Sequence, residues 1–193
     1  CGIYGIKPSY GRVPYGRHTT NNHSSHIGPM TRTVTDAAMM LHVMSGPDDR
    51  DQTSLEAPPA DYVGRLDEGT KGLRVAFSAD LGYAGVDDEV ARIVADAVTA
   101  FAELGVSVVH RDPGFENPKG IFKTHWWAGA AGAFAHYPDS EKAKLEPELA
   151  EIVADGQNLD IMDYMAAMEG RTALCSQLRS FFQEFDLLLT PSL

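Results

Sequence analysis

The chain has 193 residues, of which 44% are hydrophobic and 22% charged, and its formal net charge is −11 at pH 7. This length suits one domain with a hydrophobic core, and the acidic balance argues against a surface that binds nucleic-acid phosphates. No apolar run reaches the roughly 18 residues of a membrane span. The two cysteines, Cys1 and Cys175, are too few for a disulfide scaffold or a clustered zinc site, so we expect a reducing, cytoplasmic setting.

The first 29 residues are rich in Gly, Pro, Ser, Asn and His, which predicts irregular loop. A helix is predicted to follow, because Thr33 is a good N-cap and Asp36 lies three residues after it. Gly46 and Pro47 end this helix. Its expected apolar face consists of Val34, Ala37, Ala38, Leu41 and Met44.

The middle of the chain predicts a strand–helix–strand unit. A strand is expected within 72–80, an amphipathic helix over 88–104 and a second strand over 106–110, with Gly105 at the C′ position of the helix. Short links of this kind predict that the two strands are parallel.

The remaining residues predict mostly helix. Asn117 and Pro118 suit the start of one helix, residues 140–155 a charged helix that restarts at Pro147, and residues from Asn158 a long helix. The inward residues expected on that long helix are Met162, Met165, Ala166, Leu174, Leu178 and Phe181. The closing run FDLLLTPSL predicts a strand buried on both faces. This pattern of helices and strands indicates an α/β protein. The sequences at both ends suggest that the chain is a piece of a larger protein.

The N-terminal Cys1-Gly2 pair raises the hypothesis of an N-terminal nucleophile, because the α-amino group lies beside the thiol. The first residues resemble the glutamine-hydrolysing domain of class-II amidotransferases. That resemblance covers about six residues, and the arginine segment and Asn-Gly-Glu turn that it implies are missing. A structural cysteine inside a longer chain is the competing interpretation.

A second resemblance extends over most of the chain. CGIYGIKPSYGR, GPMTRTVTDA and GPDDRDQT occur in this order, and KGLRVAF and FDLLLTPSL follow them. These blocks resemble the amidase-signature enzymes, which implies an α/β fold with a mixed, largely parallel central sheet flanked by helices. Residues 1–193 are then expected to be a single domain that forms part of a larger amidase domain.

The resemblance implies hydrolysis of a small carboxamide by a Ser, a cis-peptide Ser and a Lys, without metal or cofactor. In that family all three residues precede the matched segment, so we assign no catalytic residue to this chain and expect it to be inactive alone. Lys7 belongs to the loop after the nucleophile, and Ser24-Ser25 has no glycine-rich surroundings. Alternatives are the amidase subunit of a tRNA-dependent amidotransferase and a scaffold without catalysis; a homodimer stays open.

Within 112–185, Trp126 and Trp127 are the candidate substrate-binding residues, because apolar pockets are rich in aromatic side chains. Adjacent helical residues point about 100° apart, so one of them at most reaches a given pocket. Packing in the core is the alternative for both side chains.

Three other groups of residues have structural explanations that we favour over a functional site, and a fourth is a candidate for such a site. Loop histidines explain His18, His23 and His26 better than a metal site, and a solvated turn explains Asp48, Asp49 and Asp51 better than a calcium loop. We expect Met162, Met165 and Met168 in a core or interface. Thr190 and Pro191 end a predicted strand at the sheet edge where α/β proteins place their sites.

Overall fold

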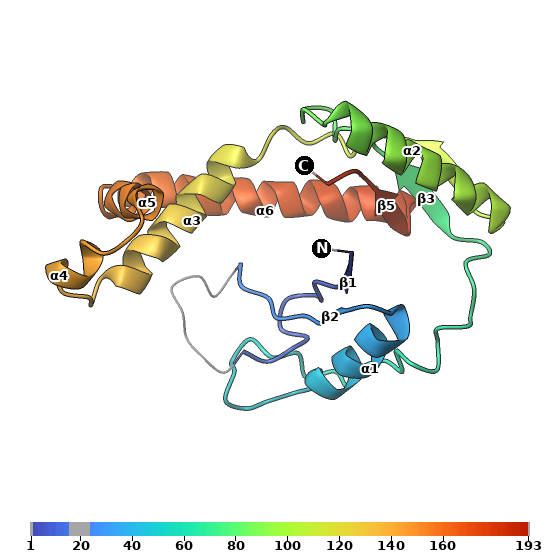
Figure 1. Ribbon diagram of the computed structural model, residues 1–193, viewed down its shortest axis with the longest axis horizontal. Helices are drawn as coiled ribbons and strands as arrows, with labels where there is room; N and C mark the ends of the chain where they lie inside the picture. Colours follow the sequence, from blue (N-terminus) through green and yellow to red (C-terminus); the bar gives the residue numbers. More distant parts are fainter. Residues whose placement is uncertain (1, 16–23, 193) are drawn as a thin grey trace. The chain divides into compact units, whose positions relative to one another are not determined.

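The computed structural model describes residues 2–15 and 24–192 (Figure 1). Contacts group them into two units, one holding the residues up to Gly69 with Gly132–Pro138, the other Thr70–Ala131 and the residues from Asp139. The single domain over 1–193 stays a prediction. No helix among the described residues has both the length and the apolar character of a membrane span.

The first unit is built on a short antiparallel ladder and one helix. β1 (Tyr4–Gly5) pairs with β2 (Met30–Thr31), and the N–H of Ile6 donates to the carbonyl of Pro29 at 3.1 Å. These two-residue strands lie inside and next to a segment that we predicted to be loop. Gly28 is required there, because a Cβ would overlap the carbonyl oxygen of Ile6.

Helix α1 (Val34–Met44) confirms the predicted cap. The Thr33 hydroxyl accepts a 3.1 Å hydrogen bond from the N–H of Asp36, which satisfies one of the free N–H groups of the first turn. The buried residues of α1 are Ala37, Ala38 and Leu41, whereas Val34, predicted on the same face, is half exposed.

The second unit contains a parallel sheet of β3 (Arg74–Phe77), β4 (Ser107–His110) and β5 (Leu187–Leu189), in the order β4-β3-β5. Val75 stands opposite Val108 on one side and Leu187 on the other. This confirms the α/β class and the parallel pairing of the strands at 72–80 and 106–110. The expectation that the closing strand is buried on both faces is wrong, because Leu187 is 41% exposed. The buried strand is β3, which has a neighbour on each side.

Helix α2 (Asp88–Glu103) agrees with the predicted helix to within one residue. The Asp87 carboxylate caps it by accepting from the N–H groups of Glu89 and Val90, and Gly105 after it has φ +74°. The periodicity predicts one apolar face of Val90, Val94, Ala97, Val98, Phe101 and Leu104. Four of these residues are less exposed, whereas Ala97 and Leu104 are exposed. α2 packs against β4, so the strand–helix–strand unit is confirmed.

Three further helices precede the last one. α3 (Lys119–Phe134) begins where Asn117 caps it, with Oδ1 accepting from the N–H of Lys119 at 3.0 Å. The predicted charged helix is divided into α4 (Asp139–Lys142) and α5 (Pro147–Gln157), with the expected restart at Pro147.

The long helix α6 (Ile161–Glu184) is present, but half of its predicted inner face is wrong. Met162 is 69% exposed and Met165 45% exposed, whereas Ala167 and Phe181 are buried. Six of the less exposed positions are spaced alternately by three and four residues: Tyr164, Ala167, Arg171, Leu174, Leu178 and Phe181. Gly170 adjoins them. This stripe includes an arginine and a tyrosine, so hydrophobicity alone placed the face incorrectly over the first turns.

Candidate functional site

The carboxyl ends of the parallel strands hold a polar pair, in which a buried serine contacts an exposed aspartate. The Ser78 side chain directly follows β3 and is 1% exposed; its Oγ donates to Oδ1 of Asp112 at 2.6 Å and accepts from the N–H of Leu81 at 2.9 Å. The N–H of Ser78 also donates to the carbonyl of Leu189. This edge is where open α/β sheets place ligand sites.

The turn after β3 is held in an unusual backbone conformation by that pair. Leu81 has φ +58°, the one positive φ of a non-glycine residue in the described chain. Positive φ is unfavourable for a residue with a Cβ, so the surrounding contacts must hold the turn. Among the described residues, neither Ser78 nor Asp112 has a histidine or lysine as hydrogen-bond partner. The pair therefore stabilises a turn and is not arranged as an activated nucleophile.

An open hollow of about 510 Å³ lies beside this edge. It is lined by the segment Arg111 to Gly114 and by the last turns of α6, including Ser176, Ser180 and Glu184. The lining side chains are mostly exposed and carry both signs of charge, so the hollow does not select one ligand chemistry.

At the amino end of the sheet an ion pair joins β3 to the start of β5. Arg74 Nη2 lies 2.8 Å from Asp186 Oδ1, and the N–H of Arg74 donates to Oδ2 at 2.8 Å. Hydrogen bonds from the guanidinium and then from the backbone N–H lower the pKa of Asp186 to about 2. This pair connects residues that are 112 positions apart in the sequence.

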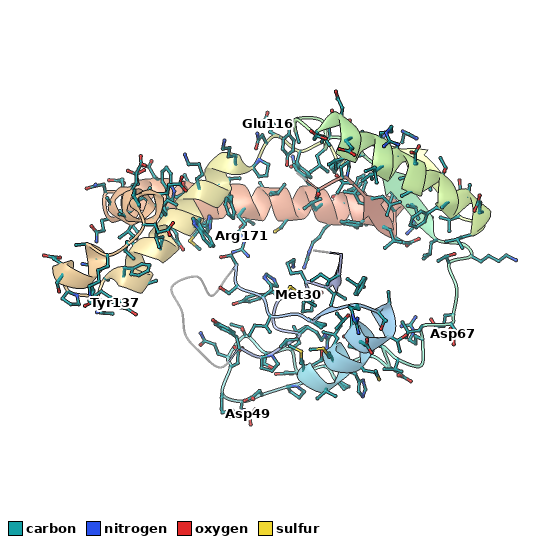
Figure 2. The ribbon with its side chains drawn as sticks, in the orientation of Figure 1. Met30, Asp49, Asp67, Glu116, Tyr137 and Arg171 are labelled. Atoms are coloured by element: carbon teal, nitrogen blue, oxygen red, sulfur yellow. The ribbon has the colours of Figure 1, made fainter. Side chains whose placement is uncertain are left out.

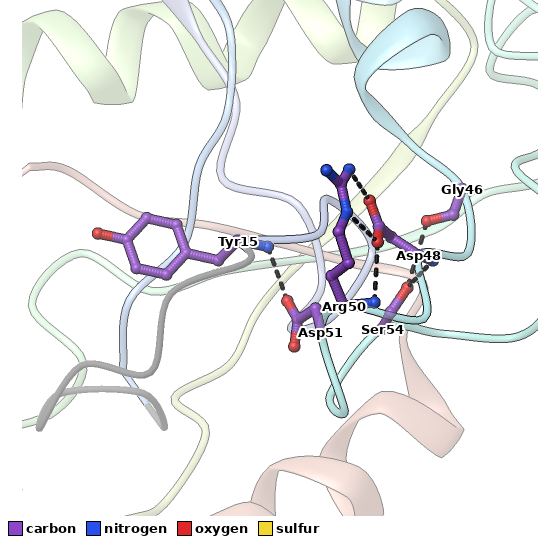
Figure 3. A network of polar contacts seen from close by, with 6 residues as sticks. All are labelled: Tyr15, Gly46, Asp48, Arg50, Asp51 and Ser54. Atoms are coloured by element: carbon purple, nitrogen blue, oxygen red, sulfur yellow. Dashed lines mark hydrogen bonds and ion pairs between the residues drawn. The ribbon is translucent and has the colours of Figure 1, made fainter.

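The first unit contains a polar network in the turn after α1 (Figure 3). The guanidinium of Arg50 binds both oxygens of Asp48 at 2.9 and 2.6 Å. Hydrogen bonds from the Arg50 side chain, followed by its backbone N–H, lower the pKa of Asp48 to about 2. Ser54 Oγ accepts from the N–H of Asp48 at 3.0 Å and donates to the carbonyl of Gly46 at 3.3 Å, which closes the turn.

This turn is bound to the N-terminal segment at successive positions. The N–H of Leu55 donates to the carbonyl of Gly11 at 2.9 Å, and the N–H of Gly46 donates to that of Arg12 at 3.3 Å. Arg12 Nη1 donates to the carbonyl of Ala57 at 3.0 Å. Gly11 has φ +76° and a Cβ there would overlap the carbonyl oxygen of Thr53, so only glycine fits.

The two candidate substrate-binding tryptophans have different surroundings on α3. Trp126 is 46% exposed and stacks on Phe122, with ring centroids 5.9 Å apart. Trp127 is less exposed, and Lys123 Nζ lies 4.1 Å from its ring centroid. Neither indole lines the hollow beside the sheet edge. Their role in binding substrate stays a prediction.

Comparison with known proteins gives the family. The Amidase family matches residues 1–193. The chain belongs to the amidase family. An acylamidase of Rhodococcus erythropolis is 34% identical over 199 residues, which cover 100% of this chain and 41% of that protein. A glutamyl-tRNA(Gln) amidotransferase subunit of Trichlorobacter lovleyi is 39% identical over 219 residues, covering 99% of this chain and 45% of that protein.

Solved structures agree with the amidase fold. A bacterial aryl acylamidase of the amidase-signature enzymes has a TM-score of 0.87 at 27% identity, over 98% of this chain and 41% of that one. The 6-aminohexanoate cyclic dimer hydrolase has a TM-score of 0.80 at 21% identity, over 96% of this chain and 41% of that one. The amidase-family chain thus spans less than half the length of the relatives that it matches.

The amidase blocks quoted from the sequence fall mainly in the first unit. Arg12 of the first block binds the loop carbonyls of Ala57 and Pro58. The prediction of a solvated turn holds for Asp49, which is exposed and lies on the outside of the loop in Figure 2. It is incomplete for Asp48 and Asp51, whose carboxylates bind the turn itself.

Other predicted positions of the amidase-family chain lie outside any described cluster or outside the described residues. Cys1, His18 and His23 are among the residues not described, so the hypotheses on them are untested. His26 Nδ1 lies 3.1 Å from the carbonyl of Ser24, and its ring contacts Tyr10. The residues that are described contain no group of His, Cys, Asp and Glu suited to a metal ion.

Sequence reasoning missed the Ser78–Asp112 pair. Ser78 lies inside the strand predicted within 72–80, so the sequence did not place it after a strand. In the structure Ser78 directly follows β3 and Asp112 is the second residue after β4, and the carboxyl ends of parallel strands meet at one edge. The Arg74–Asp186 pair had no signal in the sequence either.

Proposed function

We propose that this chain is part of an amidase that hydrolyses small acyl amides, aryl amides among them, and that it acts in the cytoplasm. Two observations support the substrate class. The acylamidase of Rhodococcus erythropolis matches the whole chain at 34% identity, and a bacterial aryl acylamidase has the same fold with a TM-score of 0.87.

The proposed mechanism follows the amidase-signature resemblance. A lysine accepts a proton from a serine in a cis peptide, and this serine accepts the proton of a second serine, which attacks the amide carbonyl. The C–N bond then breaks, the amine leaves with a proton returned through the first serine, and the acyl group stays on the second serine. Backbone N–H groups of a glycine-rich loop stabilise the oxyanion, and water then releases the acid. We propose that all three residues precede Cys1 in the longer protein. The present chain supplies the framework behind them, and we expect it to be inactive alone.

A second function has its own support. The glutamyl-tRNA(Gln) amidotransferase subunit of Trichlorobacter lovleyi is 39% identical over 99% of this chain, a higher identity than that of the acylamidase. A protein of this class would act with partner subunits and with glutamine as its amide. We favour the acylamidase because the fold agreement is higher, with a TM-score of 0.87 against 0.66 for the corresponding amidotransferase subunit of Thermotoga maritima.

The test is expression of this chain together with the coding sequence that precedes it. We expect this longer protein to hydrolyse 4-nitroacetanilide. A fluorophosphonate that labels one serine upstream of Cys1 should block the hydrolysis. Residues 1–193 alone, purified in the same way, are the control without turnover. If the longer protein turns over only glutamine, and only with added partner subunits, it is an amidotransferase subunit instead. If it acts on neither amide, the interpretation as a scaffold without catalysis holds.

A further inference from the structure

The Asp51 carboxylate reaches from the turn after α1 to the backbone of the N-terminal segment. Its Oδ2 accepts from the N–H of Tyr15 at 2.7 Å (Figure 3). Its Oδ1 accepts from the N–H and from Oγ1 of Thr53 at 2.9 and 2.7 Å. A charged carboxylate that accepts several N–H and O–H groups makes stronger hydrogen bonds than a neutral acceptor.

Asp51 differs in this respect from Asp48 in the same turn. The Asp48 carboxylate binds Arg50, two positions away, so that interaction is local. The Asp51 carboxylate binds a residue 36 positions away. Of these two carboxylates, that of Asp51 therefore joins the two loops.

The contact with Tyr15 is the last of several hydrogen bonds between the N-terminal segment and the turn after α1. Residues 9–15, here called the N-terminal strap, are bound at Gly11 by Leu55, at Arg12 by Gly46 and Ala57, and at Tyr15 by Asp51. The other contacts of this series use backbone groups or the strap's own arginine. Asp51 thus supplies, from the turn, the side chain that holds the end of the strap.

We propose that Asp51 is a positioning residue for amide hydrolysis, holding the N-terminal strap so that the polypeptide joined to its start is fixed in the reactive geometry. The inference rests on the proposed function, in which the nucleophilic serine precedes Cys1. A small displacement of a reacting group costs a large factor in rate, so a carboxylate that never touches the substrate still affects turnover.

The variants are Asp51→Ala and Asp51→Asn in the longer active protein. The first removes both acceptors, and the second keeps one amide oxygen that serves either Thr53 or Tyr15. Asp49→Asn is the matched control: it lies in the same turn, is exposed, and makes no side-chain hydrogen bond or ion pair with any residue that the structure describes.

Three measurements separate positioning from general stability. With Asp51→Ala, hydrogen exchange at the Tyr15 amide rises, and the rate constant for serine labelling by a fluorophosphonate falls roughly 10- to 100-fold per folded molecule. The kcat falls by a similar factor, while KM changes by less than about twofold, because the proposal gives the strap no contact with the substrate. Asp51→Asn gives intermediate values, and Asp49→Asn matches the unchanged protein.

Each other outcome overturns a specific statement. Unchanged protection of the Tyr15 amide in Asp51→Ala would show that the Asp51 carboxylate does not hold the N-terminal strap. Lost protection with unchanged kcat and labelling rate would overturn the positioning role alone. If the longer protein does not hydrolyse amides, the proposed function and the positioning role are both overturned. The exchange measurement would still show whether Asp51 holds the N-terminal strap.

Discussion

Ser78 Oγ lies 2.6 Å from Asp112 Oδ1 and 2.9 Å from the N–H of Leu81, so one buried hydroxyl joins the turns after two parallel strands. Ser78→Ala removes this donor and acceptor and leaves the N–H of Leu81 without its partner. We expect the free energy of unfolding to fall by about 1–3 kcal/mol, the cost of an unsatisfied buried group.

Urea unfolding followed by circular dichroism measures this change. Ser107→Ala is the matched control, because Ser107 is an exposed serine on β4 of the same sheet, and its effect should stay within about 0.5 kcal/mol. Equal effects of the two substitutions would contradict a specific role of the Ser78 hydroxyl.

The Arg74–Asp186 pair predicts a dependence of stability on pH. The pKa of Asp186 is lowered from 3.8 to about 2 in the folded chain. A lowered carboxyl pKa stabilises the fold above the unfolded value, and this contribution is lost as the pH falls from about 4 through about 2. The unfolding midpoint of Asp186→Asn should therefore lie below that of the unchanged chain at pH 6 and approach it at pH 2.

Salt and a second substitution check that the effect comes from this pair. Because the pair is solvent-exposed, high ionic strength should reduce the difference. Adding Asp186→Asn to a chain that already carries Arg74→Met should change the midpoint less than it does in the unchanged chain. A difference that is independent of pH would refute this prediction.

Two helical glycines should respond in opposite directions to alanine. Gly156 in α5 faces α3, where a Cβ would overlap the carbonyl oxygen of Trp127 and lie 2.9 Å from Ala131 Cβ. Since the neighbour includes backbone, Gly156→Ala should destabilise the fold by about 1–3 kcal/mol. Gly120 in α3 faces open space, so Gly120→Ala should stabilise it by about 0.4–1 kcal/mol. Thermal unfolding of both variants is compared with that of the unchanged chain. If the two substitutions change the free energy of unfolding in the same direction, the result contradicts the packing of α5 on α3.

The two tryptophans should separate into a binding and a packing role. Trp126 is the more exposed, so in the active longer protein we expect Trp126→Ala to lower kcat/KM for an aryl amide about 10-fold relative to acetamide. Trp126→Phe should restore most of the preference, because the aromatic surface remains.

Trp127→Ala removes the contact with Lys123 and should cost about 0.5–1 kcal/mol of stability. It should leave the ratio of the two kcat/KM values unchanged, since adjacent helical side chains point in different directions. A change of the ratio only with Trp127→Ala would reverse the two roles.

The sequence by itself determined what depends on neighbouring residues. The cap at Thr33, the cap at Asn117, the C′ glycine at Gly105 and the periodicity of α2 are local patterns, and each predicted the element that the structure contains. The amidase blocks also indicated the family, because each block is a continuous stretch of sequence that can be recognised without the structure.

Only the tertiary structure decided which strand is central and which helix face is covered. Burial depends on what packs from elsewhere, so three consecutive leucines form an edge strand, whereas Val75, between two neighbours, is buried. The same holds for Asp186 with Arg74, Asp112 with Ser78 and Asp51 with Tyr15: each pair joins residues at least 34 positions apart. Such contacts follow from the path of the chain through space, which no local pattern of side chains encodes.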